Sequence, residues 1–185
     1  RFEDPVLDPN GRGKDADWRG VVRLCQTLLA ERSKDLQIAA HLTEAAARME
    51  GFPAVAEGLG LTRALMDGFW PSVHPGVEDG QVIFAVRARW ISWLGSSRDF
   101  LAAVKSIPLT SGPGVPGRSW QDYENSQRVD TASLQSDKKQ YQELIGLGLI
   151  PGADWKAAVA ATPHDRLRGT IEAIAACEEE VRLLT

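Results

Sequence analysis

The sequence predicts an all-α protein, a compact bundle of antiparallel helix pairs arranged in one or two lobes. Three observations support this class. Apolar residues recur at steps of three and four along several stretches of the 185-residue chain. Glycine and proline stand between these stretches, where short turns between helices are needed. No stretch sustains the alternation of apolar and polar residues that is typical of a strand.

The composition argues against several functional classes. The net charge is -4, and each half of the chain carries two more acidic than basic residues, so we expect no basic face for nucleic acid. No apolar run approaches the length of a membrane span. The two cysteines, Cys25 and Cys177, lie far apart in the sequence without partners at zinc-site spacing. We expect both to be buried free thiols, which fits a reducing compartment.

The chain opens with a segment, residues 1–16, that we expect to be irregular because it carries Pro5, Pro9, Gly11 and Gly13. Asp15 or Asp17 is the expected cap of the first helix, because a carboxylate there can accept the free N–H groups of the first turn. Apolar residues then recur at helical spacing from Trp18, and we expect this helix to end near Arg32.

A second helix is expected to follow, with Ser33 as its N-cap and Asp35 in its first turn, where the helix dipole favours a carboxylate. We expect Asp35 to hold this terminus while Lys34 reaches a carbonyl or carboxylate on a neighbouring element. The apolar surface of the helix is wide and rich in alanine, so neighbours can approach closely and the helix is expected in the middle of the bundle. A polar stripe is expected to face solvent: Lys34, Gln37, His41, Glu44 and Arg48.

Gly51 is the expected C-cap of that helix, and Pro53 is expected to start a third helix at a position that tolerates a missing N–H. Pro71 prevents its continuation. His74 lies in this helix exit, where its imidazole is expected to hydrogen-bond exposed helix carbonyls. Trp70 also stands at the helix end, where it serves either a binding face or local packing.

The remaining helical segments are expected at 81–94, 97–106, 119–123 (a short turn), 133–149, 154–161 and after Pro163. The final helix has an apolar stripe expected to face inward: Leu167, Ile171, Ile174, Cys177, Val181 and Leu184. The chain thus divides into a lead-in (1–16), an N-terminal helical domain (17–108), a Gly/Pro linker (109–118) and a C-terminal helical lobe (119–185) that packs on the first.

No motif in the sequence indicates catalysis. Four Gly-x-Gly sequences lack the preceding strand that a phosphate loop needs, and Gly58 and Gly60 lie within a helical stripe, which favours close helix packing instead. His41 and Glu44 stand one helical turn apart, and we interpret them as part of the solvated stripe. The sequence therefore predicts no catalytic residue, no metal site and no cofactor.

One ordered set of residues resembles a known family, the TssA (ImpA-related) proteins of type VI secretion systems, in their N-terminal domain. The resemblance covers about residues 17–110 and rests on Trp18, Val21, Val22, Leu28, Leu29, Ser33-Lys34-Asp35-Leu36, Ala40, Leu42-Thr43-Glu44-Ala45, Gly51-Phe52, Glu57-Gly58-Leu59, Trp70 and His74-Pro75. Lys34, Asp35, Leu36, Trp70, His74 and Pro75 are the candidate interaction or structural motif.

The resemblance implies an all-helical domain of a non-enzymatic assembly factor in the bacterial cytoplasm. Its expected partners are proteins of the baseplate, the sheath and inner tube, or the membrane complex, with no nucleic acid and no membrane insertion of this segment. The family's ring-forming C-terminal region is not in this sequence, so homo-oligomerisation is expected of the full-length protein through that region.

Two other functions remain open from the residues alone. The first is a hydrolase with a dispersed site that uses His74 or His41, since these imidazoles are available. The second is a peptide-binding helical-repeat module, since helices joined by short turns also occur in solenoids. A deep pocket joining a histidine to a nucleophile would favour the first, and a regularly curved stack of helix pairs would favour the second.

Overall fold

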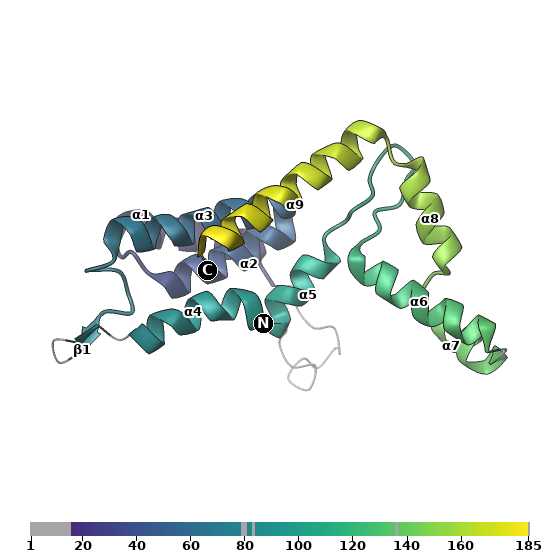
Figure 1. The fold of residues 1–185 in the computed structure, drawn as a ribbon, viewed down its shortest axis with the longest axis horizontal. Coiled ribbons are helices and arrows are strands. Elements are labelled where there is room, and N and C mark those ends of the chain that lie inside the picture. The colour runs from purple at the N-terminus through teal and green to yellow at the C-terminus, as the bar shows by residue number, and fades with distance from the viewer. Residues whose placement is uncertain (1–15, 79–80, 83, 136, 185) are drawn as a thin grey trace.

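The protein is all-α in the part of the chain that the computed structural model describes, residues 16–78, 81–82, 84–135 and 137–184 (Figure 1). The predicted lead-in lies outside these ranges except for Ala16, as does Asp15. The described helices are α1 (Trp18–Glu31), α2 (Leu36–Glu50), α3 (Phe52–Phe69), α4 (Phe84–Ser96), α5 (Arg98–Ser106), α6 (Trp120–Leu134), α7 (Lys138–Gly146), α8 (Gly152–Ala161) and α9 (His164–Leu184). Two short strands, β1 (Val77–Glu78) and β2 (Gln81–Val82), pair antiparallel between α3 and α4.

The helices form two groups in space, as Figure 1 shows. In the first group α2 is central, because it packs against α1, α3, α4 and α5. In the second group α6 packs against α7 and α8 around a small core of its own: Val129, Ala132 and Leu144. Helix α9 starts beside α8 and ends on α3, so it joins the two groups. The predicted all-α class and the central position of the second helix are confirmed; the domain boundaries stay a prediction.

Close packing of α2 on α3 depends on a glycine. A Cβ on Gly58 would lie 2.6 Å from Cγ2 of Thr43, whose side chain is fully buried and whose hydroxyl donates to the carbonyl of Ala39 at 2.8 Å. Thr43 therefore has no room to move away without losing its hydrogen bond or its packing. This confirms the prediction that Gly58 serves helix packing.

Helix α9 is held on α3 by an ion pair and a thiol contact. Arg63 and Glu180 form two hydrogen bonds, Nε to Oε2 at 2.9 Å and Nη2 to Oε1 at 3.1 Å. The Cys177 thiol donates to the carbonyl of Phe52 at 3.2 Å. Since Cys177 meets the start of α3 and Glu180 meets its middle, the two helices run in the same direction. Both cysteines are free, and burial raises the pKa of Cys25 and of Cys177.

Several sequence-based boundaries were wrong. Gln81 and Val82 belong to β2, so the fourth helix starts at Phe84 instead. The expected turn at 119–123 is a full helix, α6, because Ser119 and Asp122 form a reciprocal capping box that starts it firmly. The helical segment expected at 133–149 is shorter in the structure, where it is α7 with Asp137 as its cap.

The final helix buries only part of its apolar stripe. Cys177 and Leu184 pack against the main core, as predicted. Ile171, Ile174 and Val181 are exposed, and Ile171 is 66% exposed. The prediction that these three side chains face inward was wrong, because α3 is the main helix against which α9 packs and the first half of α9 extends beyond the start of α3 (Figure 1).

Replacing Gly58 by alanine is expected to lower the free energy of unfolding by about 1–3 kcal/mol, since the added methyl group must push α3 away from Thr43. Urea titration followed by circular dichroism measures the change. Gly68 is the matched control, because it lies in the same helix with nothing within 4 Å of an added Cβ. Gly68→Ala is expected to gain about 0.4–1 kcal/mol, and equal effects of the two variants would contradict this packing role.

Acid is expected to weaken the α3–α9 contact. The hydrogen bond from Arg63 holds the pKa of Glu180 below its ordinary value, so its contribution to stability is complete above the unfolded-state pKa and is lost as the pH falls through the folded-state pKa. The stability difference between the wild type and Glu180→Gln should be largest near neutral pH and shrink below about pH 4. Thermal unfolding at several pH values measures this, with Glu172→Gln as the control on the same helix. A difference that stays constant from neutral pH to pH 3 would contradict the assignment.

Candidate interaction surface

The fold brings the two ends of the sequence-predicted motif together at one corner of the molecule. Residues 34–36 and 74 lie side by side as a short parallel bridge between Asp35 and His74. The Leu36 N–H donates to the His74 carbonyl at 3.0 Å, and the His74 N–H donates to the Lys34 carbonyl at 2.7 Å. The turn after α1 and the turn after α3 are thereby joined through their backbones.

Asp35, rather than Ser33, is the N-cap of α2. Its carboxylate accepts from the N–H groups of Gln37 at 2.8 Å and Ile38 at 3.3 Å. The prediction that Ser33 caps the helix was wrong, because the bridge to His74 holds Asp35 in an extended conformation and delays the first helical residue to Leu36. The predicted role of Asp35 at the helix terminus is confirmed in this form.

Lys34 and Leu36 fix the corner to the helices below it. The Lys34 Nζ donates to the carbonyl of Leu29 in the last turn of α1, and it lies 5.6 Å from the centroid of the Phe69 ring. The predicted contact of Lys34 with a neighbouring carbonyl is confirmed. Leu36 is buried in the core beside Val73. Leu36 is therefore unable to contact a partner, whereas Lys34 keeps part of its stem at the surface.

A buried arginine that the sequence analysis did not single out holds the α3 exit. Arg87 on α4 is 0% exposed, and its guanidinium donates to three carbonyls: Trp70 at 2.6 Å, Val73 at 2.6 Å and Pro75 at 2.8 Å. It also lies 4.7 Å from the Trp70 ring centroid. No ion pair joins Arg87 to a carboxylate in the described ranges, so the carbonyls at the end of α3 stabilise its charge.

The prediction that His74 hydrogen-bonds the carbonyls at the end of α3 was wrong, because Arg87 does so instead. The imidazole of His74 is exposed and hydrogen-bonds no carbonyl in the part of the chain that the structure covers. A guanidinium has five N–H donors in a planar fork and can reach several carbonyls at once, which one imidazole cannot. A signal was present in the sequence: Arg87 shares a helical face with Trp90 and Leu94, where an unpaired charge is unexpected.

Aromatic side chains are exposed around this corner. Phe84 is 64% exposed and lies 5.6 Å, between ring centroids, from the half-buried Trp70. Phe69 is 41% exposed, and His74 is exposed as well. We call Phe69, Trp70, His74 and Phe84 the aromatic rim. Large apolar side chains exposed together on a rigid support are typical of a protein-binding surface.

His41 and Glu44, which we expected on a solvent-exposed stripe of α2, are partly or fully buried in the structure. His41 is half-buried, with ring centroids 5.7 Å from Trp90 and 5.3 Å from Trp93. Glu44 is 8% exposed and pairs with Arg48 at 2.8 Å. The prediction of a solvated stripe was wrong for these residues, because α4 and α5 cover that side of α2.

The described residues give the hydrolase alternative no support. Neither His41 nor His74 hydrogen-bonds a hydroxyl, thiol or carboxylate there. No group of three or more His, Cys, Asp or Glu side chains in the same ranges could hold a metal ion. The helices in those ranges also lack the combination of length and hydropathy that crossing a bilayer requires.

Two comparisons with known proteins identify the family and the fold. A family model described as ImpA, N-terminal, type VI secretion system, matches residues 4–96, half of the chain. A solved structure matches over 93% of this chain and 69% of that chain, with 29% identity and a TM-score of 0.72. It is the N-terminal domain, including the conserved ImpA_N region, of the TssA component of the type VI secretion system from Burkholderia cenocepacia. No curated protein sequence matches the chain.

Arg87→Met is expected to destabilise the protein by about 3–5 kcal/mol, because it leaves three carbonyls at the α3 exit without a donor. Urea unfolding measures the loss. Arg89→Met on the same helix is the control, since Arg89 is exposed, and we expect a change within about 0.5 kcal/mol. A loss below about 1 kcal/mol for Arg87→Met would show that water satisfies these carbonyls instead.

Proposed function

Because the chain belongs to the ImpA N-terminal family of type VI secretion proteins, we propose that it is a non-enzymatic assembly module that binds other proteins of the secretion apparatus. Its partners are components of the baseplate, the sheath and inner tube, or the membrane complex, which it meets in the bacterial cytoplasm. The function is mechanical: the domain presents a shaped helical surface that positions a partner during tail assembly. Homo-oligomerisation belongs to other regions of the full-length protein.

The observation that carries this proposal is the aromatic rim on its buried support. Phe69, Trp70 and Phe84 expose apolar area that a folded monomer gains nothing from leaving in water. Arg87 and the Asp35–His74 bridge hold the backbone beneath these rings in one arrangement. A rigid support lowers the entropy that is lost on binding, so a small aromatic surface can still give useful affinity.

The helical-repeat alternative finds less support in the arrangement of the helices. A solenoid would stack similar helix pairs, each touching only its neighbours. Here α2 contacts four other helices, and α9 returns from the far end of the chain to pack on α3. Contacts between elements so distant in sequence favour a globular interaction module.

Replacing Phe84 by glutamate is expected to abolish most partner binding while leaving the fold intact, because this ring is largely exposed and a charge there prevents apolar contact. The measurement is a pull-down of purified baseplate, sheath, tube and membrane-complex components with the 185-residue chain. Leu134→Glu is the matched control: it also places a charge on an exposed apolar side chain, 85% exposed, but at the end of α6. Equal binding by both variants would remove the aromatic rim from the proposal, and no binding by the wild type would remove the proposal itself.

A further inference from the structure

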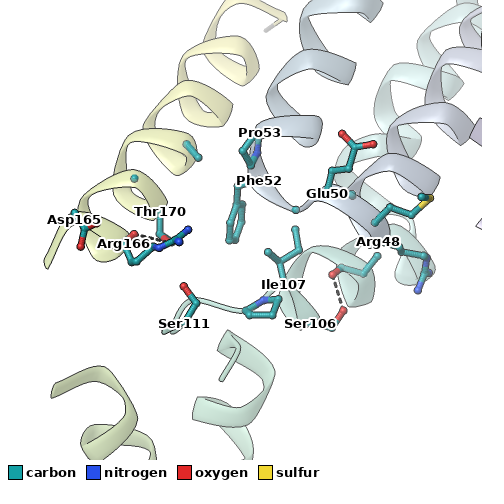
Figure 2. Close-up of a pocket in the computed structure, with 17 residues that line it drawn as sticks. Arg48, Glu50, Phe52, Pro53, Ser106, Ile107, Ser111, Asp165, Arg166 and Thr170 are labelled. Carbon is teal, nitrogen blue, oxygen red and sulfur yellow. Dashed lines mark hydrogen bonds between the residues drawn. The ribbon is translucent and has the colours of Figure 1, made fainter. Parts of the chain in front are cut away.

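A cavity of about 620 Å³ lies at the opposite end of α3 from the aromatic rim. Its walls come from the α2–α3 turn, the end of α5 with the loop that follows, and the first half of α9 (Figure 2). The loop and α9 are the two connections between the helix groups. The volume lies in the range of sites that bind small ligands or a few residues of a chain.

One wall of the cavity is apolar. Phe52 and Pro53 come from the start of α3, and Ile107 and Pro108 follow α5. Ile107 is buried, whereas Phe52 is half-buried and packs against the core cluster to which Ile107 belongs. Figure 2 shows these two side chains next to each other on this wall. These side chains can take up one bulky apolar group from water.

The guanidinium of Arg166 brings a positive charge beside this wall. The ionisable residues that line the cavity are Arg48, Glu50, Asp165 and Arg166. The Arg48 guanidinium already hydrogen-bonds Glu44 and the Asp99 carbonyl, and it lies over the ring of Trp18. Figure 2 shows the carboxylates of Glu50 and Asp165 turned away from Phe52, and the guanidinium of Arg166 turned toward it. The Arg166 guanidinium has neither a hydrogen bond nor an ion pair within the described ranges.

A hydroxyl group lies on the same side of the cavity as Arg166. Ser111 is exposed there, and no hydrogen bond holds its side chain within the described residues. The other two hydroxyls of the lining are engaged, Ser106 with the Ala103 carbonyl at 2.7 Å and Thr170 with the Arg166 carbonyl at 3.1 Å. Arg166 and Ser111 are therefore available donors for a carboxylate.

The loop after α5, which forms one wall of the cavity, is held in place by hydrogen bonds and close packing. Thr110 is fully buried, and its hydroxyl donates to the Pro116 carbonyl and accepts from the Arg118 N–H, both at 2.8 Å. Gly112 packs so closely on Pro163 that an added Cβ would lie 2.9 Å from its Cδ. A wall fixed in advance reduces the entropy lost when a ligand is ordered against it.

We propose that this cavity binds an extended peptide segment of a partner protein in which a bulky apolar side chain stands beside an aspartate or glutamate. The apolar side chain packs on Phe52 and Ile107, and the carboxylate accepts hydrogen bonds from Arg166 and Ser111. The site is a second one, separate from the aromatic rim. The choice of a peptide over a free carboxylate rests on the proposed function, since a component of an assembly meets protein segments.

The test uses the 185-residue chain and a library of random 12-residue peptides displayed on phage, followed by fluorescence anisotropy with the enriched peptides. We expect enriched sequences to share Leu, Phe or Trp within two positions of Asp or Glu. Two variants address the cavity. Gly169→Leu adds a side chain at a lining residue where nothing lies within 4 Å of the new Cβ, and leucine favours the helix more than glycine does. Arg166→Glu reverses the charge of the guanidinium that is proposed to bind the carboxylate.

Each variant has a matched control that leaves the cavity unchanged. Gly68→Leu adds the same side chain at a helical glycine with open space in α3, and Arg168→Glu makes the same charge change at an exposed position in α9. Gly169→Leu and Arg166→Glu should each raise the Kd by at least about tenfold, and the controls by no more than about twofold. Circular dichroism of all four variants should match the wild type.

The proposal would be overturned by a selection that enriches no peptide, by enriched peptides without a carboxylate, or by unchanged affinity in Gly169→Leu. Phe84→Glu separates this site from the aromatic rim, because it should leave peptide affinity unchanged while it removes binding of the secretion components. Loss of peptide binding in Phe84→Glu would place the peptide at the rim and likewise overturn the proposal.

Discussion

The candidate surface depends on the buried guanidinium of Arg87, which pairs with no carboxylate among the residues that the structure describes. An arginine keeps its proton in any protein environment, so this charge must be stabilised where it lies. The carbonyls of Trp70, Val73 and Pro75 do so, because the end of a helix presents partial negative charge and unpaired acceptors. The arginine thereby fixes the turn after α3, and through it the bridge between Asp35 and His74.

The central helix α2 shows how the bundle is completed around that corner. Its alanine-rich side meets α3 at close range, because Gly58 leaves room for the buried hydroxyl of Thr43. Part of its polar side, at His41 and Glu44, is covered by α4 and α5, and both of these side chains have partners. Glu44 pairs with Arg48, and His41 packs edge-on against two tryptophans. Burial of a paired polar group costs little, so a mixed surface can still become core.

The two candidate binding regions lie at opposite ends of α3, and they differ in chemistry. The aromatic rim at the C-terminal end offers exposed rings on a rigid support. The cavity at the N-terminal end combines an apolar wall with the guanidinium of Arg166, which has no ion pair among the described residues, and both connections between the helix groups line it. A domain with two such regions can hold a folded partner at one end and a short segment at the other. The two hydrogen bonds between Arg63 and Glu180 hold α9, whose first half lines the cavity, against α3.

The sequence by itself determined the all-α class and several helix ends, including the C-cap at Gly51 and the start of the first helix, for which Asp17 was one of two expected caps, because a cap is made by groups within about four residues of one another. It also placed Lys34–Leu36 and Trp70–Pro75 in one motif through a family resemblance. Only the tertiary structure decided that Asp35, and not Ser33, caps α2, and that the side chain of Arg87 is buried. It also decided that His41 is partly buried and that Ile171 is exposed. Each of these depends on a contact, or on the lack of one, between elements far apart in the chain, and helical periodicity carries no information about which element covers a given face.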